Sequence, residues 1–284
     1  MNENLISVIG SGTMGNGIAH VFATCPNVEK VILVDLSVQI LKNAKEIIKK
    51  NLDRQVKKEI ISQVKSEESL AKIVFTTDVE EVKESGLVIE AVKEDEMIKK
   101  NIFKKLDSIV SKDTIMATNT SSISIDKIAI NLKKSQNVIG MHFMNPVPVM
   151  KLVEIIKGSQ TNNLIVEKTL DYVSSLNKIA VECNDSPGFV SNRILMPMIN
   201  EAAFTLMEGV ASAESIDQIM KLGMGHPMGP LKLADLIGID VCVSIMNVLF
   251  DGFKQEKYRV CPLLDKMMKE NKLGIKTKKG FYKY

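Results

Sequence analysis

The stretch "LISVIGSGTMGNGIAHVFA" (residues 5–23) joins a run of strand-forming residues to a helical pattern through a glycine-rich loop. Within it, "GSGTMG" (10–15) matches the pattern G-x-G-x-x-G, in which each glycine has a physical role. Gly10 allows a tight turn, Gly12 lets the backbone approach a pyrophosphate, and Gly15 permits close contact between helix and strand. The stretch therefore predicts a strand–loop–helix unit that binds the phosphates of a dinucleotide at the helix N-terminus.

The next apolar run, "KVILVD" (30–35), strengthens this prediction. It ends in Asp35, 20 residues after Gly15, where a carboxylate can bind the hydroxyls of the adenosine ribose. That carboxylate repels a 2′-phosphate, and "LSVQ" (36–39) contains no arginine, so NAD is favoured over NADP. Lys42 and Lys45 on the following helical segment keep NADP open as the alternative.

Short strand-like runs alternate with helical patterns through the first part of the chain. We expect strands at 5–10, 30–35, 87–92, 114–118 and 137–143, and helical segments at 14–24, 38–66 and 95–110. The runs 151–156 and 178–183 are candidates to extend the same sheet. This alternation is typical of an α/β fold with a Rossmann-type, mostly parallel sheet covered by helices.

The pattern changes at "NDSPGFVSNR" (184–193), where a Pro–Gly pair indicates a domain boundary. Beyond it, only helical periodicity follows, at 190–208, 214–221, 230–250 and 262–270. We therefore predict a cofactor-binding domain over residues 1–185, with a helical arm inserted at about 38–66. An all-helical domain over residues 186–284 is expected to follow.

Composition excludes several classes of protein. The apolar fraction of 45% and charged fraction of 25% are ordinary for a soluble protein, and a net charge of +3 gives no reason to expect nucleic acid as a partner. The four cysteines lack CxxC spacing and the three histidines lie far apart, so no metal site is expected. Without an N-terminal signal pattern or a run of 18 apolar residues, a cytoplasmic protein without a membrane partner is predicted.

The segment 42–65 has an uneven charge. It holds eight Lys or Arg residues against three acids. Such a cluster is either the solvated face of a long helix or a landing site for a phosphorylated ligand.

A nicotinamide cofactor requires a nearby acid–base group, and histidine suits that role near neutral pH. Of the three histidines, His142 stands near the end of the apolar run "NVIGMHF" (137–143), while Glu154 lies inside the apolar run "KLVEII" (151–156). If the chain reverses between them, His142 faces Glu154, and the buried carboxylate would orient the imidazole. The alternative is that Glu154 pairs with Lys151 or reaches solvent and His142 only packs.

Longer motifs resemble a known family. "VIGSGTMGNGIAHVFA", "NTSSISI", "MHFMNPVPVMKLVEII", "SPGFVSNRILMPMINEA", "MGHPMGPLKLADLIGID" and the closing "GFYKY" are similar to 3-hydroxyacyl-CoA dehydrogenases, in particular to the short bacterial enzymes that act on 3-hydroxybutyryl-CoA. The resemblance runs from the first strand to the last residue. It implies an NAD-dependent enzyme that interconverts 3-hydroxybutyryl-CoA and acetoacetyl-CoA, reductively in a butyrate-type fermentation, and that forms a homodimer through the helical domain.

The resemblance also implies roles for single residues. His142 matches the catalytic base, Glu154 the carboxylate that orients it, and Ser121 and Asn192 polar groups at the substrate's C3 oxygen. The implied cofactor contacts are Gly10, Gly12, Thr13, Met14, Gly15, Asp35, Glu94, Lys99, Ser121, Asn145 and Lys276. The implied CoA contacts on the helical arm are Asn51 and Lys58, which would give the basic cluster a purpose.

One departure from the family pattern falls at the C-terminus. The family's ending usually has a glycine where "KTKKGFY" (276–282) has Lys278. If that position requires a positive φ, the turn changes locally, and the role carried over to Lys276 becomes less secure.

Two other functions remain as alternatives. A relative that acts on free 3-hydroxy acids or phosphorylated sugars would share the glycine loop and the helical domain. A non-catalytic protein could keep the cofactor fold as a redox sensor. The basic arm disfavours the first alternative, and the four polar residues of the implied catalytic site disfavour the second.

Overall fold

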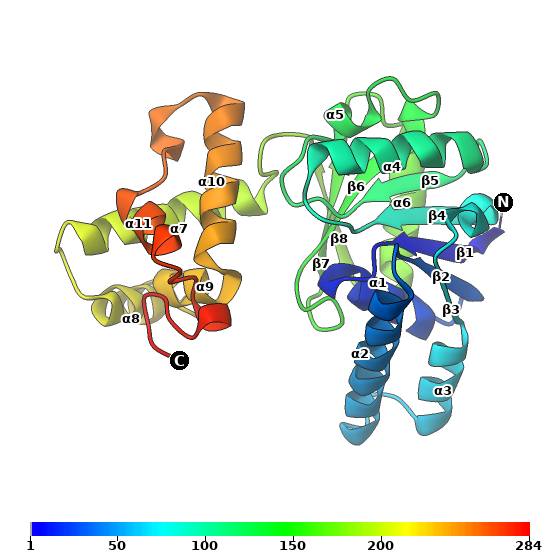
Figure 1. The fold of residues 1–284 in the computed structure, drawn as a ribbon, viewed down its shortest axis with the longest axis horizontal. Coiled ribbons are helices and arrows are strands. Elements are labelled where there is room, and N and C mark those ends of the chain that lie inside the picture. Colours follow the sequence, from blue (N-terminus) through cyan, green and yellow to red (C-terminus); the bar gives the residue numbers. More distant parts are fainter. Residues whose placement is uncertain (1) are drawn as a thin grey trace. The chain divides into compact units, whose positions relative to one another are not determined.

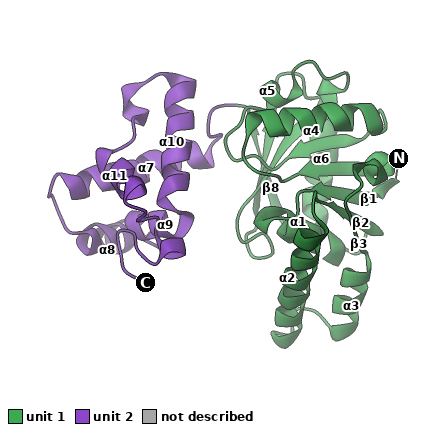
Figure 2. Ribbon diagram, in the orientation of Figure 1, with its two compact units in different colours: residues 1–185 green, residues 186–284 purple. Residues whose placement is uncertain are grey.

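The computed structural model describes residues 2–284, and their contacts divide the chain into two compact units, residues 1–185 and 186–284 (Figure 2). The first unit is an α/β sheet domain and the second consists of helices. The predicted fold class, a Rossmann-type domain followed by a helical domain, is confirmed.

Among residues 2–284, eight strands form one sheet in the order β3-β2-β1-β4-β5-β6-β7-β8. Strands β6 and β7 are antiparallel, whereas the other neighbouring pairs are parallel. Their bounds are β1 (Asn2–Ile9), β2 (Lys30–Val34), β3 (Ile73–Thr76), β4 (Ser85–Glu90), β5 (Ile115–Thr118), β6 (Val138–Phe143), β7 (Leu152–Lys157) and β8 (Ile179–Asn184).

Helices cover both faces of this sheet, with α4 and α6 on opposite sides (Figure 1). The main core joins alternate residues of the strands, such as Val8 and Ile89, to apolar residues of α1, α2 and α6. The bounds are α1 (Thr13–Thr24), α2 (Val38–Lys57), α3 (Gln63–Ala71), η1 (Val79–Glu84), α4 (Glu96–Ile109), α5 (Ile125–Ala129), η2 (Ser135–Asn137) and α6 (Asn163–Ser175).

The predicted helical segment 38–66 is two helices rather than one. Helix α2 ends at Lys57, Glu59 takes a positive φ of 56°, and Ser62 caps α3 by accepting a hydrogen bond from the Lys65 amide. The two helices run side by side as an arm beside the sheet (Figure 1). Helix α2 buries a stripe of residues spaced three or four apart, namely Leu41, Ala44, Ile48 and Leu52, and this spacing leaves most of its lysines in solvent.

The second unit is built from α7 (Ser191–Met207), α8 (Ala213–Met224), α9 (Pro230–Ile237), α10 (Ile239–Phe253), η3 (Glu256–Tyr258), α11 (Pro262–Lys269) and η4 (Ile275–Thr277). The segment predicted as one helix over 230–250 is split at Gly238, whose φ of 107° interrupts it. Within the described residues no single helix is long and apolar enough to cross a membrane, although the bent pair α9–α10 meets that criterion jointly.

The C-terminal segment is held by a buried carboxylate. Asp235 accepts hydrogen bonds from the amides of Phe281 and Tyr282 and from the Tyr284 hydroxyl. Lys278, at the position where the resemblance implies a glycine, has a φ of 58° in the left-handed region. The turn is therefore formed with a lysine in a conformation that costs an L-residue about 1–2 kcal/mol.

Candidate functional site

The glycine loop between β1 and α1 is shaped by close backbone contacts. Gly10 has a φ of 96°, and a Cβ on it would lie 2.7 Å from the Ala91 carbonyl oxygen. A Cβ on Gly15 would lie 1.8 Å from the Gly10 carbonyl oxygen, whereas a Cβ on Gly12 would meet nothing within 4 Å. Gly10 and Gly15 are therefore required by packing, and the space beside Gly12 is the place where a phosphate can approach the backbone.

Helix α1 begins within this stretch, at Thr13, so its first N–H groups, which include those of Thr13 and Met14, lie at the loop. Gly12 is the N-cap residue and has no side chain that could satisfy them. Unsatisfied N–H groups and the helix dipole together favour an anion at this end. The loop and helix fit a pyrophosphate.

Asp35 follows β2 and lies against the glycine loop. Its Oδ2 accepts hydrogen bonds from the Ser11 amide at 2.7 Å and the Ser11 hydroxyl at 2.8 Å, and Oδ1 accepts one from the Leu36 amide at 2.7 Å. These donors fix the carboxylate beside the phosphate-binding loop, as a ribose-binding acid requires. Sequence reasoning gave Ser11 no role, although its position between two glycines of the loop was a usable signal.

A hollow of about 490 Å³ lies at the end of β3, where the Thr76 carbonyl accepts a hydrogen bond from the Asp35 amide. Lys42 and Lys45 line it together with Phe75, and the Lys45 Nζ lies 5.8 Å from the centre of the Phe75 ring. Both lysines that kept NADP open as an alternative therefore lie near the ribose end of the cofactor region.

His142 and Glu154 face each other across the antiparallel pair β6–β7. The ring nitrogen Nδ1 lies 2.8 Å from Glu154 Oε2, and both side chains are buried. When Nδ1 carries the proton and donates it to the carboxylate, the basic lone pair of a neutral imidazole is on Nε2. The chain reversal predicted from the sequence is present, and it produces the predicted pairing.

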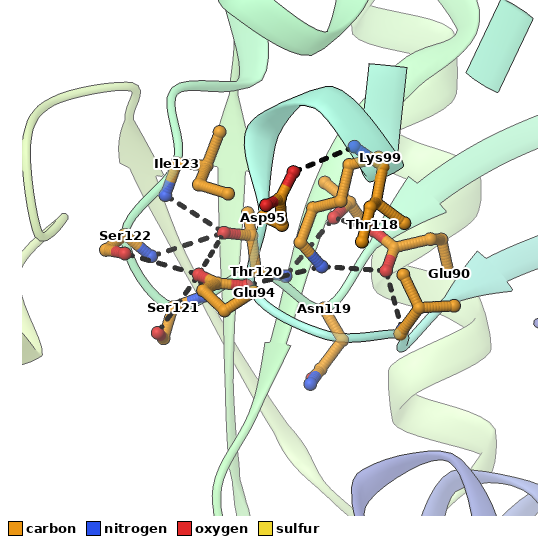
Figure 3. A network of polar contacts seen from close by, with 12 residues as sticks. Glu90, Glu94, Asp95, Lys99, Thr118, Asn119, Thr120, Ser121, Ser122 and Ile123 are labelled. Carbon is orange, nitrogen blue, oxygen red and sulfur yellow. Dashed lines mark hydrogen bonds and ion pairs between the residues drawn. The ribbon is translucent and has the colours of Figure 1, made fainter. Parts of the chain in front are cut away.

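A second polar cluster lies at the ends of β4 and β5 (Figure 3). Glu94 Oε1 accepts hydrogen bonds from the Thr120 hydroxyl at 2.6 Å, the Ser121 amide at 2.9 Å and the Ser121 hydroxyl at 3.2 Å. Lys99 Nζ lies 3.2 Å from Glu94 Oε2. Burial by itself would raise the pKa of Glu94, but the Lys99 charge and these hydrogen bonds lower it below its ordinary value.

The other residues implied by the resemblance lie in both units. Asn51 lies in the C-terminal half of α2, and Lys58 is the C-cap residue at the end of that helix. Asn145 is exposed in the segment between β6 and β7, where its peptide bond to Pro146 is cis. In the second unit, Asn192 is buried in the first turn of α7, and Lys276 forms an ion pair with Asp240 at 2.5 Å. Both residues belong to the second unit. Their roles at the substrate's C3 oxygen and at the cofactor therefore stay predictions.

A dinucleotide cradle and a buried histidine–carboxylate pair on one sheet are what a nicotinamide-dependent dehydrogenase needs. Residues 5–186 match the family model for the NAD-binding domain of 3-hydroxyacyl-CoA dehydrogenase, and residues 188–284 match the model for its C-terminal domain. The chain belongs to the 3-hydroxyacyl-CoA dehydrogenase family, and its cofactor is NAD.

Similar proteins extend over almost the whole chain. A 3-hydroxybutyryl-CoA dehydrogenase of Clostridioides difficile is 49% identical over 98% of this chain and 99% of its own length. A probable 3-hydroxybutyryl-CoA dehydrogenase of Bacillus subtilis is 46% identical over 100% of this chain and 98% of its own. The crystal structure of the (S)-3-hydroxybutyryl-CoA dehydrogenase from Ralstonia eutropha is 43% identical, has a TM-score of 0.96, and the match covers 100% of this chain and 99% of that one.

Proposed function

We propose that this chain interconverts 3-hydroxybutyryl-CoA and acetoacetyl-CoA with NAD(H). The observation that carries the proposal is the buried His142–Glu154 pair, with Nδ1 and Oε2 2.8 Å apart, on the sheet that also bears the glycine loop. The names of the Clostridioides difficile and Bacillus subtilis relatives support the four-carbon substrate.

When bound, NAD supplies the nicotinamide that accepts a hydride from C3 of the substrate or, as NADH, returns it. In the oxidative direction, His142 Nε2 takes the proton of the 3-hydroxyl as the C3–H bond breaks and the C3–O double bond forms. Glu154 stabilises the resulting imidazolium. In the reductive direction, protonated His142 gives its proton to the 3-keto oxygen as C3 gains a hydride. By analogy with bacterial relatives, we propose that the reductive direction, in a butyrate-type fermentation, is the physiological one.

Other residues are proposed to hold the reactants. Ser121 and Asn192 would bind the C3 oxygen and polarise the carbonyl. Asp35 would bind the adenosine ribose. Further cofactor contacts would come from Glu94, Lys99, Asn145 and Lys276. The glycine loop with Thr13 and Met14 would bind the pyrophosphate through backbone N–H groups.

The helical arm is the proposed binding site for CoA. Asn51 in α2 and Lys58 at its C-cap lie among the basic residues of the cluster at 42–65. CoA carries a 3′-phosphate and a pyrophosphate, which lysines bind as point charges. A free 3-hydroxy acid would make no use of these charges.

The second unit is proposed to bind a second copy of this chain. A groove of about 340 Å³ between α7 and α8 is lined mainly by apolar residues. Four apolar side chains on or beside α8 are each more than half exposed, namely Val210, Ile219, Leu222 and Met224. A face of this kind is typical of a protein interface. A monomer by analytical ultracentrifugation at micromolar concentration would contradict this part of the proposal.

The function is tested by following NADH oxidation by the purified protein with acetoacetyl-CoA, with NADPH run in parallel and free acetoacetate as the control. Fast turnover of the thioester and none of the free acid is the expected result. Equal turnover of both substrates would favour a dehydrogenase of free acids. NADH binding without turnover of either substrate would favour the sensor, and a preference for NADPH would contradict the role given to Asp35.

A further inference from the structure

The segment between β6 and β7, residues 144–151, carries Asn145, which is proposed to contact the cofactor. Its backbone is held partly from within, because the amides of Val149 and Met150 both donate to the Pro146 carbonyl, at 2.9 and 3.0 Å. Residues 149 and 150 are exposed, so this part of the segment has little packing of its own. The position of the segment therefore depends on contacts from elsewhere in the chain.

Lys178 supplies such a contact. Its Nζ donates to the carbonyls of Val147 and Met150, at 2.6 Å each. The side chain is partly buried, which lowers the pKa of Lys178 below its ordinary value, and no carboxylate among the described residues forms an ion pair with it. Hydrogen bonds from a charged donor are about twice as strong as neutral ones. The two carbonyls are thus the groups that this charge holds.

The base of the Lys178 side chain is itself fixed, at the junction of α6 and β8. The Lys178 amide donates to the carbonyl of the fully buried Val173 at 3.4 Å. The next amide, that of Ile179, donates to the Lys151 carbonyl at 2.8 Å and begins the pairing of β8 with β7. The lysine therefore reaches the segment 144–151 from an anchored part of the sheet domain.

The same segment contacts the helix that begins at the glycine loop. Val147 is 2% exposed, and a Cβ on Gly17 would lie 2.9 Å from the Val147 Cβ. Gly17 lies about one turn after Thr13, the first residue of α1. The close approach requires glycine, so the segment and the cofactor helix pack directly against each other. A shift of the Val147 carbonyl would therefore move Asn145, two residues before it, relative to α1.

We propose that Lys178 is a positioning residue for the cofactor. By holding two carbonyls of the segment 144–151, it keeps Asn145 where that side chain binds the cofactor beside α1. The register of His142 and Glu154 comes from the pairing of β6 with β7 and does not need the lysine. The inference rests on the cofactor contact given to Asn145 in the proposed function. Its expected effect falls on NADH affinity and not on proton transfer.

The test compares Lys178→Met with Lys72→Met. Lys72 is a matched control, because its ammonium is also partly buried and donates to one backbone carbonyl, that of Cys25, at 3.0 Å. Cys25 lies at the C-terminal end of α1, the end far from the glycine loop. We expect Lys178→Met to weaken NADH binding in fluorescence titrations by about 5- to 10-fold, the effect of one lost hydrogen bond. Lys72→Met should change it by less than about twofold.

Steady-state kinetics separates positioning from general damage. In Lys178→Met the KM for NADH should rise, whereas kcat with acetoacetyl-CoA should fall by less than about threefold, because the histidine–carboxylate pair is untouched. Lys178→Arg keeps a charged donor for both carbonyls, so it should restore NADH affinity to within about twofold of the wild type. A loss of kcat above tenfold with unchanged NADH affinity would overturn the proposal.

Hydrogen–deuterium exchange tests the clamp without turnover. The amides of Val149 and Met150 should exchange faster in Lys178→Met, while the amides of β7 stay as protected as in the wild type. This result stands even if acetoacetyl-CoA is not the substrate. Uniformly faster exchange across the sheet would show a general structural role and contradict the inference. If Lys178→Met does not fold, Lys178→Gln, which keeps a neutral donor, takes its place, with changes in the same direction expected.

A double-mutant cycle tests whether the effect passes through Asn145. The variant Asn145→Ala/Lys178→Met should bind NADH about as weakly as Asn145→Ala alone, because the lysine has nothing left to position. A loss equal to the product of the two single losses would show that Lys178 acts elsewhere. Unchanged NADH affinity in Asn145→Ala would remove the cofactor contact and this inference with it, whereas a different acyl substrate would leave the inference intact.

Discussion

Glu154 and Glu90 are both buried carboxylates on strands of the first unit, and they differ in the partner that each one holds. Glu154 pairs with the imidazole of His142, a side chain that can act as a general acid or base. Glu90 pairs with the ammonium of Lys99, and the ordinary pKa of a lysine is far above neutral. Burial is therefore shared by both pairs, and the partner determines whether a pair can move protons or only hold charges in place.

The largest expected effect comes from the pair that can move protons. His142→Ala should lower kcat with acetoacetyl-CoA by about 10²- to 10⁴-fold, since general acid–base catalysis contributes that much. Fluorescence titration should show NADH binding unchanged within about threefold. Loss of binding together with rate would mean that His142 is structural and that the two pairs do not differ in function.

Removing Lys99 from its pair with Glu90 should mainly destabilise the fold. Lys99→Met leaves the Glu90 charge buried and uncompensated, so the free energy of unfolding in urea should fall by about 3–5 kcal/mol. The double variant Glu90→Gln/Lys99→Met should recover much of that loss. Lys100→Met serves as the control, because it breaks the more exposed ion pair between Lys100 and Glu96. It should change the free energy of unfolding by less than about 1 kcal/mol.

Glu154→Gln sharpens the comparison because it keeps a hydrogen-bond acceptor and removes only the charge. We expect kcat to fall by about 10- to 100-fold, as for other groups that orient a reacting histidine. The KM for acetoacetyl-CoA should change much less, because the loss falls on the transition state. Equal losses in kcat and in substrate affinity would argue against an orienting role.

A third buried basic group, His20, has an amide in place of a carboxylate as its partner. Its Nε2 lies 3.1 Å from Gln55 Oε1, and burial lowers its pKa below 6.5 despite the opposing hydrogen bond. The unfolded chain therefore binds a proton more readily than the folded one as pH falls below 6.5. The stability supplied by neutral His20 should be present above pH 6.5 and be lost progressively below it. In urea titrations across this range, His20→Gln should give a flatter profile than the wild type, and an equally steep one would assign the loss to other groups.

The smallest expected effect lies in the second unit. Lys278 has a φ of 58°, which glycine adopts without strain. Lys278→Gly should raise the free energy of unfolding by about 1 kcal/mol or less, since relief of strain is partly offset by the flexibility of glycine in the unfolded chain. A decrease measured by thermal unfolding would show that the lysine side chain stabilises the turn.

Features that depend on short-range rules were predictable from the sequence. The glycine loop and Asp35 follow a spacing set by one strand–helix–strand unit. The pairing of His142 with Glu154 follows from a single chain reversal, because the two positions lie symmetrically about the turn. In both cases the residues that come together are close in sequence, so only a few conformations of the intervening chain were possible.

Features that depend on distant packing were not predictable. Strand β3 has only four residues, and its β character is set by pairing with β2. A lysine on a helix is ordinarily exposed, and nothing near Lys99 in the sequence indicates that Glu90 lies beneath it. The break after α2 was hidden because the residues on both sides of it keep a helical pattern, although Ser62 is a usable capping signal.

The hairpin formed by β6 and β7 has a further consequence for how this enzyme can vary. Its last paired residues are Phe143 and Val153, so the intervening segment lies outside the register that aligns the histidine with its carboxylate. Lengthening that segment costs little, about 0.6 kcal/mol for each doubling, whereas one residue lost inside either strand turns its side chains to the opposite face. The proposed catalytic pair can therefore keep its hydrogen-bonded geometry while the segment between the two strands changes in length.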